Sequence, residues 1–303
     1  MFVEKNNFDS IIRYFEDSLP SSSVSEINLM VKYLTLKRLN IDETDFLLKK
    51  DLLFSESDLL FFRDAVKRMQ NHEPFQHVLG EVEFYGLILK SDKRALIPRP
   101  ETEGLVDWVV KSLDKNVPIL IMDLCAGSGC VALGVKSVLT YVKVIASELS
   151  EDAIALINEN IEKTNLKIEV QRMDVLAEDA FLNFEKNSFD CWISNPPYIP
   201  NKDKILMHEN VLDFEPEMAL FVEDDDALLF YRKIAQQGQV YLKKGGLLFF
   251  EIHEELAEDV IALLKKNNFV NIELRKDLQG KDRMIKAQKL SSQNESERGE
   301  NRG

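Results

Sequence analysis

Cysteine is scarce in this sequence of 303 residues, which contains only Cys125, Cys130 and Cys191. Their number is odd and no two of them form a C-x-x-C pair, so we expect neither a disulfide framework nor a structural zinc site. The four histidines lack the spacing of metal ligands. We therefore expect no bound metal, and we expect the reducing cytoplasm as the location of the protein.

Long hydrophobic runs are also missing. No apolar run approaches the roughly 20 residues that span a bilayer, and the first residues, MFVEKNNFDS, have no basic segment followed by an apolar core. We therefore expect no membrane partner and no signal peptide. With 45% hydrophobic and 30% charged residues, the composition is typical of a soluble globular protein with room for two domains.

Positive charge is in short supply. Lysine and arginine number 38 against 52 acidic residues, which gives a formal net charge of −14. Nonspecific affinity for nucleic acids arises when basic side chains neutralise phosphates. The balance therefore argues against direct nucleic-acid binding, and it favours a small molecule or a partner that carries positive charge.

The N-terminal part is helical in its apolar spacing. Residues 1–72 repeat apolar side chains at helical intervals, as in Ile11, Phe15 and Leu19, and Pro20 interrupts the first pair of helices. We predict a small domain of four or five short helices. Residues 73–98 have a different pattern, with short apolar runs on both sides of Gly86, and they predict a hairpin linker.

Residues 99–289 alternate apolar runs of strand length with amphipathic segments. The strands are predicted at residues 119–122, 142–146, 168–171, 191–194 and 247–252. This alternation predicts an α/β fold, a Rossmann-like, doubly wound parallel sheet that binds ligands at the carboxyl ends of its strands. Residues 272–274 and 284–286 predict a C-terminal antiparallel hairpin. The tail, residues 290–303, has almost no apolar residues and is expected to be disordered.

A glycine-containing loop follows the first predicted strand and opens a helix. It reads Asp123-Leu124-Cys125-Ala126-Gly127-Ser128-Gly129-Cys130. Glycine permits positive φ and lets a ligand approach the backbone N–H groups at the start of a helix. The loop therefore predicts the binding site of a cofactor.

Acidic residues after the next two strands suit a nucleoside. Glu148 can accept hydrogen bonds from ribose hydroxyls, and Asp174, with Val175 beside it, can accept from an adenine amino group. Both a nicotinamide dinucleotide and S-adenosyl-L-methionine fit this outline. Asp123 favours the second, because its carboxylate would repel a pyrophosphate but suits the ammonium group of S-adenosylmethionine.

The tetrapeptide after the fourth predicted strand offers a second half to the site. Two prolines cannot continue a ladder, so the chain must leave the strand in a stiff, extended turn. That turn places an amide side chain, backbone carbonyls and an aromatic ring where they can hold a planar NH2 group. Its residues are Asn195, Pro196, Pro197 and Tyr198.

Over residues 72–287 the chain resembles the release-factor glutamine methyltransferases, which are protein-(glutamine-N5) methyltransferases. The resemblance is carried by the glycine loop, the NPPY tetrapeptide, GEVEFYG at 80–86, IPRPETE at 97–103, EP at 215–216, KGG at 244–246 and KDLQGKDR at 276–283. It implies that the helical domain, residues 1–72, helps to bind the protein substrate and that a class I methyltransferase domain follows it. It also implies peptide chain release factors as protein substrates, methylated at the glutamine of a Gly-Gly-Gln loop.

Two departures from the family pattern lie among the predicted cofactor-binding residues. The family commonly has glycine where this chain has Cys125, and aspartate where it has Glu148. Cys125 is small enough to fit if its φ is negative, and Glu148 keeps the carboxylate one methylene longer.

The proposed chemistry assigns catalytic roles to the tetrapeptide. The Asn195 side-chain oxygen and the Pro196 carbonyl can each accept one N–H of a substrate amide, which orients its nitrogen and stabilises the charge that it gains. Tyr198 either packs over the amide or is a core aromatic. Arg99 either meets a ligand carboxylate or stabilises the linker. Two rival functions stay open: N6-adenine methylation of nucleic acid, and glutamine methylation of a ribosomal protein.

Overall fold

The chain forms two compact units. The computed structural model describes residues 3, 5–48, 52–206, 209–223 and 226–291. The first unit comprises residues 1–81 and 208–214, and the second comprises residues 82–207 and 215–303. The predicted domain boundary at residue 72 stays a prediction. The tail expected to be disordered lies outside the described residues from residue 292 onward.

The first unit is a helical bundle, and four of its helices lie within the described part of residues 1–72. Its helices are α1 Phe8–Ser18, α2 Val24–Leu39, α3 Glu43–Leu48, α4 Glu56–Gln70, α5 Phe75–Leu79 and α9 Glu209–Phe214. The ring of Phe62 packs edge-on against Phe54 and Phe15, at centroid distances of 5.0 and 6.3 Å. Ser23 and Ser55 begin α2 and α4 with capping boxes, which satisfy the free N–H groups there.

A short hairpin, β1 Glu81–Phe84 and β2 Leu87–Lys90, follows, and the assignment of residues 73–98 as a linker stays a prediction. Its two turn residues, Tyr85 and Gly86, have φ of 50° and 74°. A two-residue turn with both central φ values positive matches the twist of the flanking strands, and it favours glycine at the second position.

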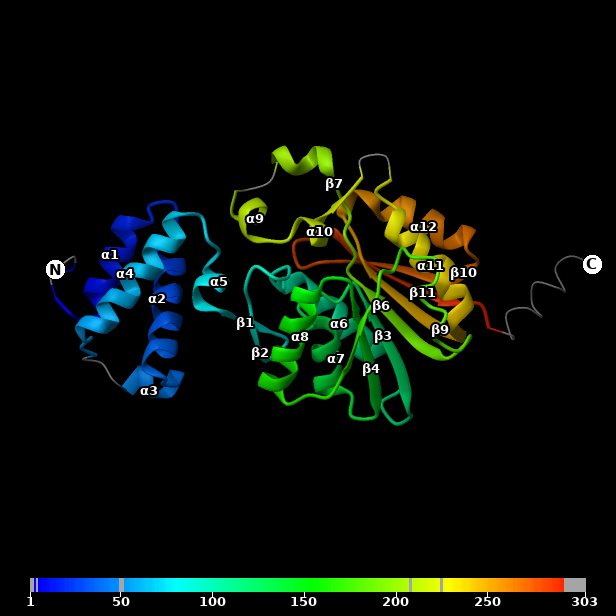
Figure 1. Ribbon diagram of the computed structural model, residues 1–303, viewed down its shortest axis with the longest axis horizontal. Coiled ribbons are helices and arrows are strands. Elements are labelled where there is room, and N and C mark those ends of the chain that lie inside the picture. The colour runs from blue at the N-terminus through cyan, green and yellow to red at the C-terminus, as the bar shows by residue number, and fades with distance from the viewer. Residues whose placement is uncertain (1–2, 4, 49–51, 207–208, 224–225, 292–303) are drawn as a thin grey trace, which may run out of the picture. The chain divides into compact units, whose positions relative to one another are not determined.

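The second unit is built on a sheet that has seven strands within the described residues (Figure 1). Their order is β10-β11-β9-β6-β3-β4-β5. The bounds are β3 Ile119–Leu124, β4 Val142–Glu148, β5 Glu169–Arg172, β6 Phe189–Ser194, β9 Leu242–Glu251, β10 Phe269–Lys276 and β11 Asp282–Lys289. The strands from β9 to β5 are parallel, and β11 is antiparallel to both of its neighbours. The predicted doubly wound sheet and its C-terminal hairpin are confirmed.

Helices cover both faces of this sheet. One layer contains α6 Pro100–Ser112, α7 Cys130–Val138 and α8 Glu151–Thr164, and the other contains α11 Leu229–Tyr241 and α12 Ala257–Lys266. Successive strand residues point to opposite faces, so Ile193 packs in the first layer and Trp192 in the second. Burial on both faces explains why these strands are continuous apolar runs in the sequence.

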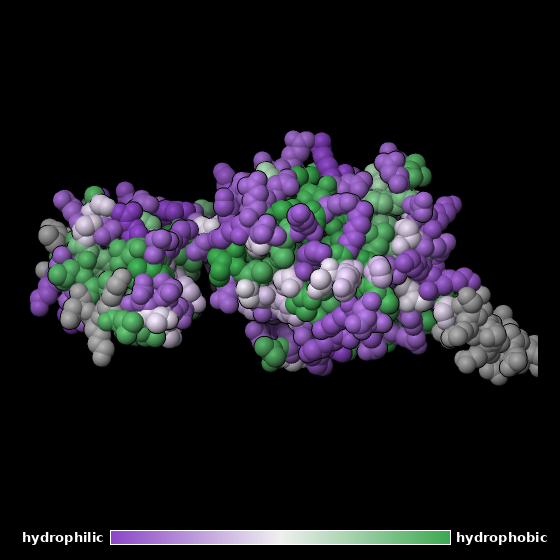
Figure 2. All heavy atoms as spheres, turned by 90° about the horizontal axis from the view of Figure 1, so that it is seen from below, coloured by the Kyte–Doolittle hydropathy of each residue, from purple (hydrophilic) through white to green (hydrophobic). Residues whose placement is uncertain are grey.

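Polar side chains cover much of the face of the molecule that Figure 2 draws. On the face drawn in Figure 2, hydrophilic residues surround smaller apolar patches on each unit. The large apolar side chains Trp108, Trp192 and Phe249 are at most 1% exposed. Within the described ranges, no helix has the length and apolar character needed to cross a membrane.

The parallel strands end together at one edge of the sheet. Leu124, the last residue of β3, pairs with Ser147 of β4 and Ser194 of β6, and Ser194 pairs in turn with Phe250 of β9. The Ser194 hydroxyl also donates to the Leu124 carbonyl at 2.7 Å. Short elements follow β6 and β9, namely β7 Ile199–Pro200, η1 Asn201–Leu206, α10 Glu217–Leu220, β8 Phe221–Val222 and η2 Glu254–Leu256. The glycine loop, Glu148 and the tetrapeptide therefore all begin at this edge.

Candidate active site

A cavity of about 370 Å³ lies at the carboxyl edge of the sheet in the second unit. Ten of the predicted site residues line it: Asp123, Cys125, Ala126, Gly127, Ser128, Glu148, Asp174, Val175, Asn195 and Pro197. The remaining three, all in the described part of the chain, are not in its lining: Gly129, Pro196 and Tyr198. The lining also includes residues 94–99, 216, 218, 219 and 221–223, for which the sequence predicted no cavity role beyond the two readings of Arg99.

The two loop glycines meet different requirements. Gly127 has φ of 55°, and a Cβ at this position would meet no atom within 4 Å, so the backbone is open on that side. Gly129 has φ of 78° and caps α7, where a Cβ would lie 3.1 Å from the Ile157 side chain. Gly127 thus leaves room for a ligand, whereas Gly129 lets α7 and α8 pack closely.

Cys125 corrects one expectation from the sequence. Its φ is +60°, so the condition under which cysteine was expected to fit, a negative φ, is not met. The backbone of the loop needs a left-handed residue here, and a side chain with a Cβ costs roughly 1 kcal/mol in that conformation. Burial raises the pKa of the Cys125 thiol, and the nearby Glu148 and Asp123 raise it further. Cys125 therefore stays protonated, as a packing residue would.

Asp123 is a buried carboxyl group that borders the cavity with 1% of its surface exposed. Its Oδ2 accepts a hydrogen bond from the Ala132 backbone N–H at 3.0 Å. Burial raises the pKa of Asp123 to about 8, and the charge of Glu148 adds to the rise. Such a group gains most from a cationic partner, because a nearby positive charge favours its ionised form.

Glu148 uses its extra methylene to tie the loop to the end of β4. Its Oε2 accepts from the Gly127 N–H at 2.8 Å, and its Oε1 accepts from the N–H groups of Leu149 and Ser150 at 2.7 and 3.0 Å. These bonds use three of the roughly four acceptor positions of a carboxylate. Asp174 is exposed, and it accepts from the Leu176 N–H at 2.9 Å.

Asn160 of α8 fastens the hairpin to the glycine loop. Its side chain is fully buried, accepts from the Lys90 N–H at 2.6 Å and donates to the Ser128 carbonyl at 3.1 Å. The buried Ser128 hydroxyl has no nitrogen or oxygen partner among the described residues, and its side chain interacts with the Cys130 thiol. One amide side chain thus joins three segments at one corner of the cavity.

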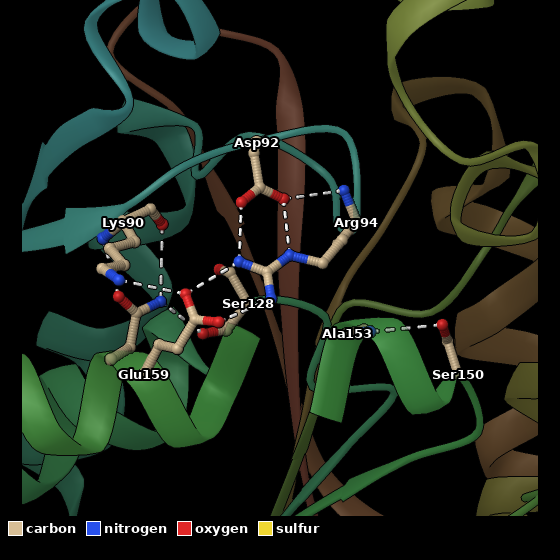
Figure 3. Close-up of polar contacts among 8 residues, drawn as sticks. Lys90, Asp92, Arg94, Ser128, Ser150, Ala153 and Glu159 are labelled. Atoms are coloured by element: carbon tan, nitrogen blue, oxygen red, sulfur yellow. Dashed lines mark hydrogen bonds and ion pairs between the residues drawn. The ribbon is translucent and has the colours of Figure 1, made fainter. Parts of the chain in front are cut away.

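Arg94 adds an ionic contact at the same corner (Figure 3). Its guanidinium bridges the Asp92 carboxylate, at 2.7 and 2.9 Å, and the Glu159 carboxylate, at 2.8 Å. These carboxylates raise the pKa of Arg94, chiefly because they accept hydrogen bonds from its guanidinium, Glu159 contributing most and then Asp92. At the start of α8, Ser150 caps the helix by accepting from the Ala153 N–H.

The tetrapeptide leaves β6 at Ser194, and its residues divide between two environments. Asn195 and Pro197 reach the cavity. Tyr198 is packed against the His253 ring at a centroid distance of 5.8 Å, and its side chain is hydrogen-bonded with Arg283. Burial raises the pKa of Tyr198 to about 12. Its position is that of a packing residue behind the turn.

Arg99 stabilises the end of the linker through a shared contact with Glu215. Its guanidinium pairs with Glu215, whose side chain is 1% exposed, and the second carboxylate oxygen accepts from the Ile97 N–H at 3.0 Å. Arg99 also lines the cavity. Of the two readings left open, stabilisation of the linker is the one with a contact in the structure.

Glu251, at the end of β9, is a polar residue of the site that sequence reasoning missed. It is 3% exposed, accepts from the Thr102 hydroxyl at 2.7 Å and is hydrogen-bonded to the Asn195 side chain. Burial raises the pKa of Glu251 to about 7. The only local signal was an acidic residue at the end of an apolar strand.

The sheet order, the glycine loop and the carboxylates at the strand ends together define a class I methyltransferase. Family models match in agreement with this: "Methyltransferase small domain" over residues 106–213 and "PrmC N-terminal domain" over residues 10–80. The fold prediction for both parts of the chain is confirmed.

Named relatives identify the family. The chain is 40% identical to the release factor glutamine methyltransferase of Flavobacterium psychrophilum, over 81% of this chain and 86% of that protein. It is 35% identical to the one of Bacteroides thetaiotaomicron, over 93% and 99%. A solved structure of a release factor-specific protein-(glutamine-N5) methyltransferase from Alicyclobacillus acidocaldarius is 27% identical over 64% and 94%, with a TM-score of 0.40. The chain belongs to the release factor glutamine methyltransferase family.

A first prediction concerns the strain at Cys125. We expect Cys125→Gly to be more stable than Cys125→Ala by roughly 1 kcal/mol, because only glycine adopts the left-handed conformation without cost. Urea unfolding of the full chain, followed by the fluorescence of Trp108 and Trp192 in the second unit, measures the difference. An alanine variant that equals or exceeds the glycine variant would contradict the strain.

A second prediction concerns Asn160. Asn160→Ala leaves the Lys90 N–H and the Ser128 carbonyl without their partner, at a cost of about 1–3 kcal/mol. We expect faster hydrogen exchange in residues 87–94 and 126–130 of the full chain, with helix α4 unchanged. Asn158→Ala, the same change at an exposed asparagine of helix α8, is the matched control and should change exchange much less. Equal exchange in the two variants would refute the role of Asn160.

Proposed function

We propose that this enzyme transfers a methyl group from S-adenosyl-L-methionine to the side-chain nitrogen N5 of the glutamine in the Gly-Gly-Gln motif of peptide chain release factors. The observation that carries the proposal is that the glycine loop and Asn195 border the same cavity. The names of the relatives support the class of substrate.

The cavity residues fit the cofactor. Asp123 offers a buried carboxyl group with a raised pKa to an ammonium group, and the open backbone at Gly127 admits a ligand. Glu148 would hold the ribose, and Asp174 with Val175 would hold the adenine. When bound, S-adenosylmethionine supplies an electrophilic methyl group on a sulfonium centre.

The substrate amide needs orientation more than a base. An amide nitrogen is a weak nucleophile, since its lone pair is delocalised into the carbonyl. The side-chain oxygen of Asn195 accepts one N–H of the substrate, and the Pro196 carbonyl accepts the other. Two fixed acceptors hold the nitrogen in line for attack and stabilise the positive charge that it gains. The methylated nitrogen is acidic and loses its proton readily, so no strong base has to act first.

A third prediction tests the reaction and the role of Asn195 together. Purified protein with labelled S-adenosylmethionine should label a release factor, and it should not label the same factor with Gln→Ala in the Gly-Gly-Gln loop. Asn195→Ala should abolish transfer and change cofactor affinity much less, because it removes an acceptor for the substrate. Scintillation counting and calorimetry measure the two quantities.

Four outcomes would overturn the assignment of the reaction or of the role of Asn195. Label on the Gln→Ala factor would exclude this glutamine as the target. Label on DNA or RNA would favour N6-adenine methylation of nucleic acid. Label on a ribosomal protein would favour glutamine methylation of that protein. Residual turnover of Asn195→Ala together with a large loss of cofactor binding would place Asn195 in the cofactor site instead.

A fourth prediction follows from Asp123. With a pKa of about 8 in the free protein, the carboxyl group is largely neutral at pH 6.5, whereas an ammonium partner favours its ionised form. Binding therefore releases a proton, and affinity rises with pH up to about 8, by at most about tenfold per pH unit. Calorimetry at pH 6.5 in two buffers of different ionisation enthalpy counts the protons.

Two variants separate the sources of that proton. Asp123→Asn should eliminate the release, and Glu251→Gln should keep it, although the pKa of Glu251 is also near neutral. Undiminished release from Asp123→Asn would show that Asp123 does not meet the ammonium group.

A further inference from the structure

Glu251 sits behind the one polar side chain that the tetrapeptide presents to the cavity. The Thr102 hydroxyl donates to its Oε2 at 2.7 Å, and the Asn195 side chain is hydrogen-bonded to the same carboxyl group. The Tyr231 hydroxyl donates to the Glu251 backbone carbonyl at 3.1 Å, which holds the end of β9 in place. Both Glu251 and Thr102 are at most 3% exposed, so water does not compete freely for these bonds.

The direction of the bond from Asn195 follows from the chemistry of its partner. An ionised carboxylate only accepts hydrogen bonds, and the amide of Asn195 can donate only through its NH2 group. With the NH2 group turned to Glu251, the amide oxygen is left for the cavity that Asn195 lines. We propose that Glu251 is a positioning residue that sets which atom of the Asn195 amide meets the substrate. This inference rests on the proposed function.

The orientation matters because the substrate is itself an amide. An Asn195 oxygen in the cavity accepts an N–H and so brings the substrate nitrogen to the reacting position. The NH2 group of a turned Asn195 would instead donate to the substrate carbonyl and bring the wrong atom there. The two orientations have the same shape, so packing alone does not choose between them, and the choice falls to the hydrogen-bond partner.

Glu251 fixes this orientation of the Asn195 amide only while its carboxyl group is ionised. Burial raises its pKa to about 7, and the hydrogen bond from Thr102 and the charge of Arg283 work against the rise. A protonated carboxyl group has an O–H that can donate to the Asn195 oxygen and stabilise the turned orientation. The titratable or charged groups that interact with Glu251 come from each neighbouring element: Arg283 of β11, Glu101 of α6, Cys130 of α7, Tyr231 of α11 and Tyr198.

The kinetic test uses three variants of the full chain with a release factor as substrate. For the wild type, kcat should fall as the pH drops through about 7, since Glu251 becomes protonated. Glu251→Gln carries both a donor and an acceptor at every pH, so kcat at pH 8 should fall by about 10- to 100-fold and the transition near pH 7 should disappear. KM for S-adenosylmethionine should change little.

The other two variants make the test specific. Thr102→Val removes a bond that favours the ionised form, so the pH midpoint should move upward. Glu254→Gln, a surface residue of the same region that pairs with Lys281, should leave the profile unchanged. A Glu251→Gln enzyme with the wild-type kcat and pH profile would overturn the inference, and so would a Thr102→Val profile with an unmoved midpoint.

A readout without turnover separates this inference from the proposed function. In protein labelled with 15N-asparagine, the side-chain NH2 signal of Asn195, assigned by its loss in Asn195→Ala, should titrate with a midpoint near 7. The titration should be absent from Glu251→Gln. Titration without any methylation of a release factor would reject the proposed function alone. Methylation that needs Asn195, with an NH2 signal that ignores pH and Glu251, would reject the positioning role alone.

Discussion

The end of β6 is the constraint on which the site depends. Pro196 and Pro197 have no backbone N–H, so the ladder cannot continue past Ser194. The strand lies in the interior of the sheet, between β3 and β9, and its apolar residues are buried on both faces. Because the strand ends there, Asn195 lies between the glycine loop on one side and the end of β9 on the other. Shifting this stop by one residue would turn the amide away from the cavity.

Elements with a local signature were predictable from the sequence. Strands β3, β4, β6 and β9 are apolar runs because both sheet faces are covered, and the β1–β2 turn needs a glycine at residue 86 for its positive φ. The glycine loop is likewise recognisable in the sequence, because a helix that starts directly after a buried strand needs residues with unusual backbone angles. In each case a few consecutive residues carry the physical requirement.

The contacts that shape the cavity have no such signature. Thr102 and Glu251 are 149 residues apart, Ile97 and Glu215 are 118 apart, and Lys90 and Asn160 are 70 apart. The polar side chains that accept or donate these bonds look like those of ordinary surface residues until the fold buries them, namely Thr102, Glu251, Glu215 and Asn160. The backbone angle of Cys125 could not be predicted for a related reason. Cysteine favours negative φ, but the closure of the loop imposes a positive φ at this position.

The two departures from the family pattern are linked through the same loop. The left-handed Cys125 costs the loop roughly 1 kcal/mol relative to glycine. Glu148, longer than aspartate by one methylene, reaches back to the Gly127 N–H at 2.8 Å and so crosses the loop that contains Cys125. A hydrogen bond to a charged group contributes about 1.5–3 kcal/mol, which is enough to offset the strain. Glu148 thus stabilises a loop conformation that Cys125 disfavours, and the Glu148 carboxylate still borders the cavity.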